Sequence, residues 1–189
     1  MIPLTEIKHR DDFGAWLSSN GYCGKGVEVG VHAGHYSKMI LDHWHSGTML
    51  YGVDPYCVQP RTEYEDSSNS PDIYRARSEC ERRFAHDERY NLLVMKSLEA
   101  VTLFNDGELD FVYLDGNHSF EAVSADLRAW WPKVRSGGVL CGHDYYNNVG
   151  LIDGAVWNSE AERAVLAWHG KRPWVSLACT SWWILKEAT

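Results

Sequence analysis

Acidic and histidine side chains follow directly after several short apolar segments of the sequence. Asp54 and Asp115 each end such a segment, and the pair His143-Asp144 follows another. His118 lies three residues beyond Asp115. Carboxylates and imidazoles are common proton acceptors and metal ligands in active sites, although a single aspartate can equally well cap a turn. Their repeated placement at segment ends predicts one shared polar site.

A glycine-containing turn follows the first apolar segment, with the spacing G-x-x-x-G and an acid two residues before the first glycine. Gly30 allows a tight turn after a strand, and Gly34 allows the backbone to approach a ligand at a helix start. The spacing departs from the G-x-G-x-x-G pattern that binds a dinucleotide pyrophosphate. With Glu28 before it, the turn suits a ligand that carries an ammonium group. Asp54, about 20 residues downstream, is placed to bind ribose hydroxyls.

The elements that must position these residues alternate between apolar and amphipathic segments, which predicts βαβ units and a parallel sheet. Strands are predicted at residues 26–31, 49–54, 91–95, 109–115 and 139–142, followed by 174–178 and 181–185 around a tight turn. Helices are predicted around residues 13–17, 40–44, 98–104 and 159–169. Ligands of such sheets bind outside the carboxyl ends of the strands, where the acids lie.

Two further helices have clear start signals. Ser70-Pro71-Asp72 combines an N-cap, a proline at the first position and an acid at the positive end of the helix dipole, and this helix is expected to end near His86. Ser119 is predicted to cap a strongly amphipathic helix that Pro132 ends or bends. Residues 136–138 are expected to turn the chain into the fifth strand. Residues 55–70 form a long polar loop, which is typical of a lid or a binding loop.

Composition excludes several classes of protein. The chain has 189 residues, 44% of them hydrophobic and 23% charged, which predicts one globular domain over residues 1–189. A net charge of −8 argues against a nucleic-acid partner, because phosphate binding needs a basic face. The five cysteines form no C-x-x-C pair, and neither a secretory signal nor a membrane span is apparent. We therefore expect a cytoplasmic protein without zinc knuckle, disulfide framework or membrane partner.

The sequence resembles class I S-adenosylmethionine-dependent methyltransferases in five segments: VEVGVHAGHYS, YGVDPY, FVYLDGNHSFEAV, DLRAWWPKVRSGGVLCGHDY and SWWILK. The nearest subgroup is the small bacterial type called methyltransferase family 24, which is related to macrolide-sugar O-methyltransferases. The resemblance covers roughly residues 26–186. It implies a Rossmann-like, doubly wound α/β fold with a seven-stranded sheet, mostly parallel with an antiparallel last strand.

The resemblance also implies where the cofactor S-adenosylmethionine binds. One group of residues would line its methionine side: Glu28, Gly30 and Gly34. Asp54 would hold the ribose hydroxyls, and Ser97 would contact the adenine. Asp115 would face the methionine end and the reaction centre.

Two catalytic mechanisms remain possible, one with a bound cation and one with a histidine base. In metal-dependent relatives the positions of Asp115, His143 and Asp144 bind a divalent cation, often magnesium. His143 departs from an all-oxygen ligand set, and an imidazole favours manganese, iron, zinc or nickel over magnesium. His143 could instead point away, leaving Asp144 with Asn147 or Asn148 as ligands. In macrolide-sugar relatives the position of His118 carries a catalytic base. The alternative is that His118 only caps the following helix or forms a hydrogen bond within the loop.

We therefore expect a methyltransferase that acts on a hydroxyl of a small molecule or glycan. The long loop of residues 55–70 is expected to border the acceptor site. Such a hydroxyl is a poor nucleophile until a base or a metal (Mg or Mn) removes or acidifies its proton. One alternative is an NAD-type oxidoreductase, against which the missing G-x-G-x-x-G argues. The other is a non-catalytic module that binds a cofactor or a partner, against which the acids at every strand end argue. A homo-oligomer whose second subunit completes the acceptor pocket is also compatible with so short a chain.

Overall fold

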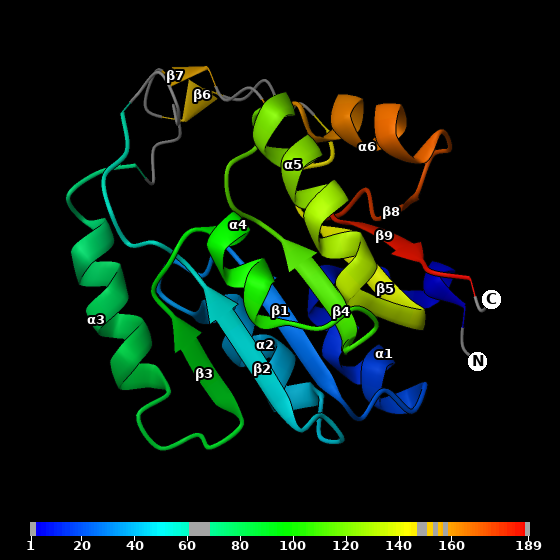
Figure 1. Cartoon of the computed structure of the whole chain (residues 1–189), viewed down its shortest axis with the longest axis horizontal. Helices are drawn as coiled ribbons and strands as arrows, with labels where there is room; N and C mark the ends of the chain where they lie inside the picture. The colour runs from blue at the N-terminus through cyan, green and yellow to red at the C-terminus, as the bar shows by residue number, and fades with distance from the viewer. Residues whose placement is uncertain (1–2, 61–68, 147–150, 153–154, 157–158, 188–189) are drawn as a thin grey trace.

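The computed structural model of the chain describes residues 3–60, 69–146, 151–152, 155–156 and 159–187. A seven-stranded sheet in the order β3-β2-β1-β4-β5-β9-β8 forms its centre (Figure 1). The strands are β1 (Lys25–Val29), β2 (Met49–Val53), β3 (Tyr90–Leu93), β4 (Leu109–Leu114), β5 (Val134–Gly142), β8 (Trp174–Val175) and β9 (Trp182–Leu185). The first five are parallel to one another, and β9 is antiparallel to both β5 and β8. The predicted sheet with its antiparallel last strand is confirmed. A separate antiparallel pair consists of β6 (Leu151–Ile152) and β7 (Ala155–Val156).

Helices cover both faces of the sheet, as a doubly wound fold requires. One layer holds α1 (Phe13–Ser19), α2 (His35–His43) and α3 (Ile73–Arg83), and the other holds α4 (Ser97–Ala100), α5 (Phe120–Trp130) and α6 (Ala161–His169). The described residues also contain four 3-10 turns: η1 (Leu4–Glu6), η2 (Arg10–Asp12), η3 (Val101–Leu103) and η4 (Trp131–Lys133). None of the helices that the structure describes is long and apolar enough to cross a membrane.

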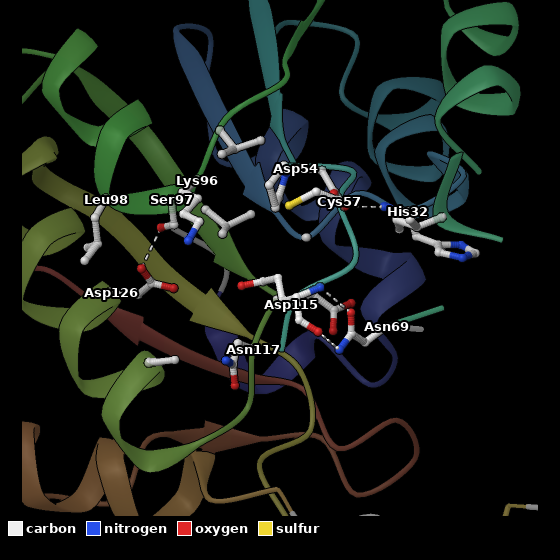
Figure 2. A pocket seen from close by; sticks show the side chains of 18 of the residues that line it. His32, Asp54, Cys57, Asn69, Lys96, Ser97, Leu98, Asp115, Asn117 and Asp126 are labelled. Carbon is white, nitrogen blue, oxygen red and sulfur yellow. Dashed lines mark hydrogen bonds between the residues drawn. The ribbon is translucent and has the colours of Figure 1, made fainter. Parts of the chain in front are cut away.

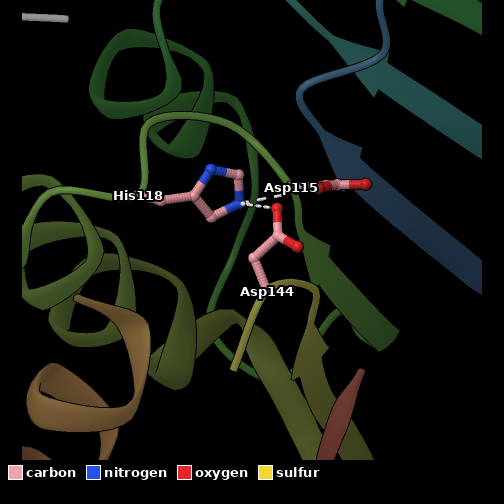
Figure 3. A group of neighbouring side chains, drawn as sticks. All are labelled: Asp115, His118 and Asp144. Carbon is pink, nitrogen blue, oxygen red and sulfur yellow. Dashed lines mark ion pairs between the residues drawn. The ribbon is translucent and has the colours of Figure 1, made fainter. Parts of the chain in front are cut away.

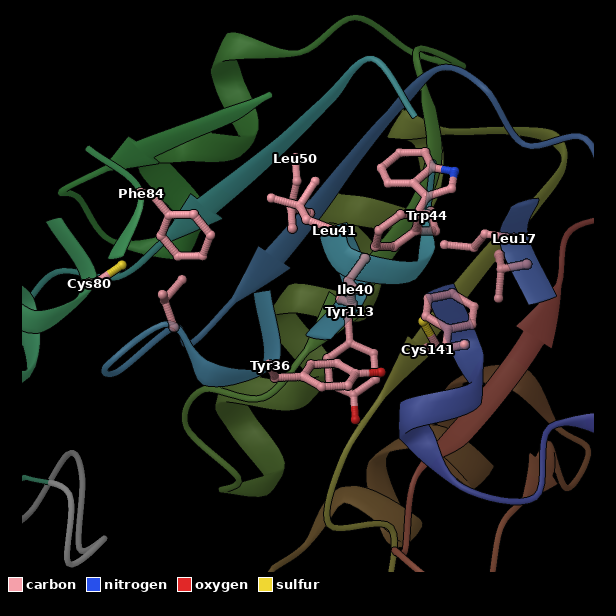
Figure 4. Packing of buried hydrophobic residues seen from close by; sticks show 14 of the residues in the cluster. Leu17, Tyr36, Ile40, Leu41, Trp44, Leu50, Cys80, Phe84, Tyr113 and Cys141 are labelled. Atoms are coloured by element: carbon pink, nitrogen blue, oxygen red, sulfur yellow. The ribbon is translucent and has the colours of Figure 1, made fainter. Parts of the chain in front are cut away.

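Successive side chains of each strand point to opposite faces of the sheet, so the core consists of two apolar clusters. On β4, Phe111 and Tyr113 pack in the cluster with α1, α2 and α3, whereas Val112 and Leu114 pack in the cluster with α4, α5 and α6. Figure 4 shows part of the first cluster, where Tyr36, Ile40 and other aromatic and aliphatic side chains meet the sheet. Because β4 is buried along its whole length, its carboxyl end is held rigidly in the centre of the molecule.

Several predicted element boundaries are wrong. β1 ends at Val29, two residues early, because Gly30 turns the chain with a φ of +88°. Residues 136–138 lie inside β5, where Gly137 has a φ of +72° and the register with β4 shifts, so they form a bulge. α3 begins at Ile73 and ends at Arg83, shorter than predicted, and Ser70-Pro71 form a turn before it.

The start and end of α5 are confirmed. Ser119 is its N-cap, and the hydroxyl accepts a hydrogen bond from the backbone N–H of Ala122 at 3.3 Å. Pro132 lies in η4, where the helix tightens into a 3-10 turn and ends. This helix therefore has a fixed starting point immediately after the β4 loop.

The strand register aligns the residues that follow each strand. Val29 pairs with Val53 on one side and with Leu114 on the other, and Leu114 pairs with Gly142. The next residue of each strand therefore lies in one row along the carboxyl edge: Gly30, Asp54, Asp115 and His143. Strand order reverses between β1 and β4, and such a point opens a crevice for a ligand.

Candidate active site

A cavity of about 270 Å³ lies along this edge of the sheet (Figure 2). It is bordered by the loops that follow β1, β2, β3 and β4, and by the first turns of α5. Its lining residues are Val29, Gly30, His32, Val53, Asp54, Pro55, Cys57, Gln59, Asn69, Ile73, Lys96, Ser97, Leu98, Asp115, Gly116, Asn117, Ala122, Ala125 and Asp126. The structure thus brings Gly30, Asp54, Ser97 and Asp115 to one cavity.

Gly30 allows the β1 loop to lie against the β4 loop. A Cβ atom built on Gly30 would lie 2.1 Å from the carbonyl oxygen of Asp115, much closer than a van der Waals contact. The φ of +88° also favours glycine over any other residue. The cavity therefore depends on a residue without a side chain at this position.

Gly34 does not line the cavity. It is the N-cap of α2 with a φ of +74°, and a Cβ built on it would lie 2.7 Å from Phe84 Cε2 and 3.0 Å from Cys80 Sγ. Figure 4 shows Cys80 and Phe84 in the apolar cluster. In the structure Gly34 therefore allows close packing between α2 and the end of α3.

Glu28 is also not a lining residue. Val27 and Val29, its neighbours on β1, pack in the cluster with α4 and α5. Because successive strand residues point to opposite faces, Glu28 points toward α2, where it accepts a hydrogen bond from Ser37 Oγ. The side chain is 1% exposed, and burial raises the pKa of Glu28 to about 8. The structure therefore places this acid beneath the β1 loop and not in the cavity wall.

Asp54 connects the β1 and β2 loops at the cavity. Its Oδ2 accepts hydrogen bonds from the backbone N–H groups of Val31 at 3.1 Å and His32 at 3.0 Å. Its Oδ1 accepts one from Tyr56 at 2.8 Å. A carboxylate has about four acceptor positions, so Oδ1 can accept a further hydrogen bond from a ligand hydroxyl.

The long loop predicted to border the acceptor site contributes instead to this cavity. Pro55, Cys57, Gln59 and Asn69 are lining residues, and Asn69 closes the loop because its side chain exchanges hydrogen bonds with the backbone of Gln59. Residues 61–68 lie outside the described part of the chain.

Asp115, His118, His143 and Asp144 form one cluster beside the cavity. Figure 3 shows three of these side chains, Asp115, His118 and Asp144. His118 Nε2 lies 3.5 Å from a carboxylate oxygen of Asp115 and 3.5 Å from one of Asp144. His143 Nδ1 lies 3.0 Å from Asp144 and 3.5 Å from Asp115. The four side chains that the sequence placed after β4 and β5 therefore meet.

Local hydrogen bonds fix the two loops of the cluster. Asn117 Oδ1 accepts from the N–H of Ser119 at 2.9 Å, which tightens the turn that presents His118. Asp144 has a φ of +50°, and Ser159 Oγ donates to its carbonyl at 2.5 Å. A non-glycine residue with a positive φ, in the left-handed region of backbone conformations, is uncommon and is often found at functional sites.

Arg10 adds a cation to the cluster. Its Nη1 lies 3.4 Å from Asp115, and its guanidinium lies 4.8 Å from the centre of the Tyr36 ring. Burial opposes ionisation of Asp144, but the hydrogen bond to His143 and the charges of His143, His118 and Arg10 together lower its pKa. Asp144 is therefore ionised at neutral pH.

The residues present fit a divalent cation. One ligand atom each from Asp115, His118 and Asp144 lie within 4.8 Å of one another. Two carboxylates and an imidazole suit manganese or another transition metal better than magnesium. In this set His118 takes the place that the sequence analysis gave to His143, while Asn147 and Asn148 lie outside the described residues.

Sequence reasoning missed two charged residues of the site. Arg10 meets Asp115 across 105 residues of chain, and no local pattern signals such a contact. Asp126 projects into the cavity from α5, and its carboxylate accepts a hydrogen bond from Ser97 Oγ at 2.5 Å. A signal for Asp126 was present, since it interrupts the buried apolar face formed by Val123, Leu127 and Trp130.

A family model described as a methyltransferase domain matches residues 27–145. The chain is also similar to the uncharacterized protein y4gI of Sinorhizobium fredii, with 27% identity over 161 residues, which cover 82% of this chain and 16% of that protein. The uncharacterized protein R132 of Acanthamoeba polyphaga mimivirus is 23% identical over 120 residues, which cover 63% of this chain and 50% of R132. The chain thus spans half or less of the length of these relatives.

Solved structures share the fold. A protein from Corynebacterium glutamicum has a TM-score of 0.64 and 16% identity, covering 99% of this chain and 82% of its own. Cofactor-bound Rv0187 from MTB has a TM-score of 0.62 and 13% identity, and the match covers 100% of this chain and 83% of Rv0187. The SAH-bound methyltransferase PaMTH1 of Podospora anserina has a TM-score of 0.53 and 11% identity, covering 73% and 53%. At such identities the likeness shows the fold alone.

Proposed function

The chain belongs to the class I S-adenosylmethionine-dependent methyltransferases, and from this premise we propose that it methylates a hydroxyl of a small molecule or sugar. The observation that carries the proposal is the position of His118 between two carboxylates at the methionine end of the cofactor cavity. The NAD-type oxidoreductase is not favoured, because Asp54 already accepts hydrogen bonds from the backbone N–H groups of Val31 and His32 in the β1 turn, where a pyrophosphate would need donors. The non-catalytic module is not favoured either, because the cluster beside the cavity contains a base and its counter-charges.

The cofactor is proposed to lie along the row of strand ends. Its methionine part lies between Gly30 and Asp115, where a carboxylate can bind the ammonium group. Its ribose lies at Asp54, whose Oδ1 retains room for a hydroxyl hydrogen bond. The adenine then extends toward Ser97 at the far end of the cavity.

His118 is proposed to act as the general base. Its Nε2 takes the proton of the acceptor hydroxyl while an oxygen lone pair attacks the methyl carbon. The carbon–sulfur bond breaks, and its electron pair stays on sulfur to give S-adenosylhomocysteine. Asp115 and Asp144, each 3.5 Å from Nε2, stabilise the resulting imidazolium through their charges. The remaining contribution of the protein is to hold the reactants in line.

The acceptor is proposed to approach from the side of the cluster that faces Tyr146 and the β8–β9 turn. A second hollow of about 540 Å³ is lined by Tyr146, Lys8 and Trp174 among others. Tyr146 lies two residues beyond Asp144, and Lys8 lies two residues before Arg10. Aromatic and basic side chains of this kind suit a sugar or an aromatic alcohol.

A second candidate mechanism uses a cation instead of a base, and the donor set of Asp115, His118 and Asp144 favours it. A divalent cation bound there would lower the pKa of the acceptor hydroxyl. The two mechanisms share the cofactor site and differ in their response to chelation.

We expect methyl transfer from labelled S-adenosylmethionine to a panel of sugars and phenols to persist in excess EDTA, because His118 alone can take the proton. The product should resist alkali, since a methyl ether is stable where a methyl ester is hydrolysed. Loss of transfer in EDTA and its recovery with Mn²⁺ or Mg²⁺ would contradict the base mechanism. In that case Asp144→Ala should abolish the metal response, and Asp106→Ala, at an exposed acid outside the site, should not.

A further inference from the structure

The far end of the cavity has a carboxylate that the methyl-transfer mechanism does not use. Asp126 lies on α5, one turn beyond Ala122, and its side chain points into the cavity (Figure 2). Asp126 is 9% exposed, so the charge is held largely away from water. A buried carboxylate that faces a cavity requires a hydrogen-bond donor there.

Ser97 positions this carboxylate. Its Oγ donates to Asp126 Oδ1 at 2.5 Å and accepts a hydrogen bond from Trp130 Nε1 at 2.8 Å. The hydroxyl proton is therefore committed to Asp126, and the indole fixes the oxygen. No hydrogen bond to Asp126 Oδ2 is present within the described residues, and Figure 2 shows this oxygen directed toward the cavity.

The surroundings of Asp126 fit the flat ring of a purine. Leu98, Ala122 and Ala125 line the same end of the cavity and offer apolar contact to the faces of a ring. A carboxylate accepts hydrogen bonds and donates none. It can therefore pair with the 6-amino group of adenine, which donates, and it repels the 6-oxo group of hypoxanthine, which accepts.

We propose that Asp126 determines the selectivity of the cofactor site for a 6-amino purine over a 6-oxo purine, with Ser97 as its positioning residue. This inference rests on the proposed function, because it takes the ligand of the cavity to be S-adenosylmethionine. It assigns recognition of the adenine edge to α5, whereas the resemblance implied Ser97.

The test is calorimetric titration with two probes, S-adenosylhomocysteine and its hypoxanthine analogue, S-inosylhomocysteine. Burial raises the pKa of Asp126 to about 6, so titrations at pH 8 keep the carboxylate ionised. The wild-type protein should bind the adenine compound more tightly by about ten- to hundredfold, as loss of a hydrogen bond to a charged group predicts. In Asp126→Asn the new amide N–H donates to the 6-oxo group, so the preference should vanish or reverse.

Asp106→Asn is the matched control, because this exposed aspartate pairs with Lys133 outside the cavity, and it should keep the wild-type preference. An Asp126→Asn protein that folds and keeps the wild-type ratio of affinities would overturn the inference. If that variant does not fold, equal binding of the two probes by the wild-type protein would overturn it alone. Failure of the wild-type protein to bind either probe would contradict the proposed function instead.

Discussion

Replacing His118 by alanine is expected to lower the turnover number by about 10²–10⁴-fold, the usual contribution of a positioned general base. The affinity for S-adenosylhomocysteine should not change, because His118 is not among the residues that line the cofactor cavity. The geometry explains why turnover should fall while the affinity for S-adenosylhomocysteine stays the same. The imidazole lies 3.5 Å from the carboxylates of Asp115 and Asp144, and the cavity proposed for the cofactor has Asp115 in its wall but not His118.

Single-turnover transfer of a labelled methyl group, combined with calorimetry, measures both quantities. His45→Ala is a suitable control, because this histidine is exposed outside the site and its loss should change neither quantity. Addition of imidazole should restore part of the activity of the His118→Ala protein, which a purely structural role would not produce. Full activity of His118→Ala in the presence of chelator would exclude both catalytic roles of His118 and leave positioning as the mechanism.

Replacing Gly30 by alanine is expected to lower the free energy of unfolding by about 2–5 kcal/mol, from left-handed strain and overpacking together. The new methyl group would lie 2.1 Å from the carbonyl oxygen of Asp115, which is backbone and has no rotamer by which to move away. The β1 loop must then separate from the β4 loop. Because both loops border the cavity, cofactor affinity should fall as well.

The Gly107→Ala variant separates the cost of left-handed strain from the cost of overpacking. Gly107 has a similar φ of +71°, but a Cβ built there has no neighbour within 4 Å. Its cost should be the conformational one alone, about 1–2 kcal/mol. Urea denaturation of both variants gives the comparison. Equal destabilisation of the two proteins would show that the close approach of the β1 and β4 loops is unimportant.

Much of the fold could be predicted from the sequence, because strand periodicity and helix caps are local signals. Ser119 and Pro132 fixed both ends of α5, and the acids after β2 and β4 were correctly placed at one edge of the sheet. The boundary of β1 was wrong because the positive φ of Gly30 ends the strand before its apolar pattern ends. The bulge at Gly137 was taken for a turn because both use glycine in the same backbone conformation.

The site was less predictable than the fold. Glu28 and Gly34 belong to the glycine-turn motif. Only the packing of α2 and α3 shows that Glu28 is buried and that Gly34 lies against Phe84. Arg10 reaches Asp115 from a distant part of the chain. Asp126 interrupts the apolar face of α5, but only the folded structure shows that its carboxylate enters the cavity. These contacts depend on tertiary packing, which a local pattern does not encode.

The most direct test of S-adenosylmethionine dependence is calorimetric titration with S-adenosylhomocysteine and, separately, with NAD. We expect saturable binding of S-adenosylhomocysteine and none of NAD, because the β1 turn lacks a pyrophosphate site and Asp54 and Asp115 border the cavity. Asp54→Ala should weaken the binding by about 1–3 kcal/mol, as expected when hydrogen-bond donors lose a charged partner. Tight binding of NAD, with no response to S-adenosylhomocysteine, would contradict the account.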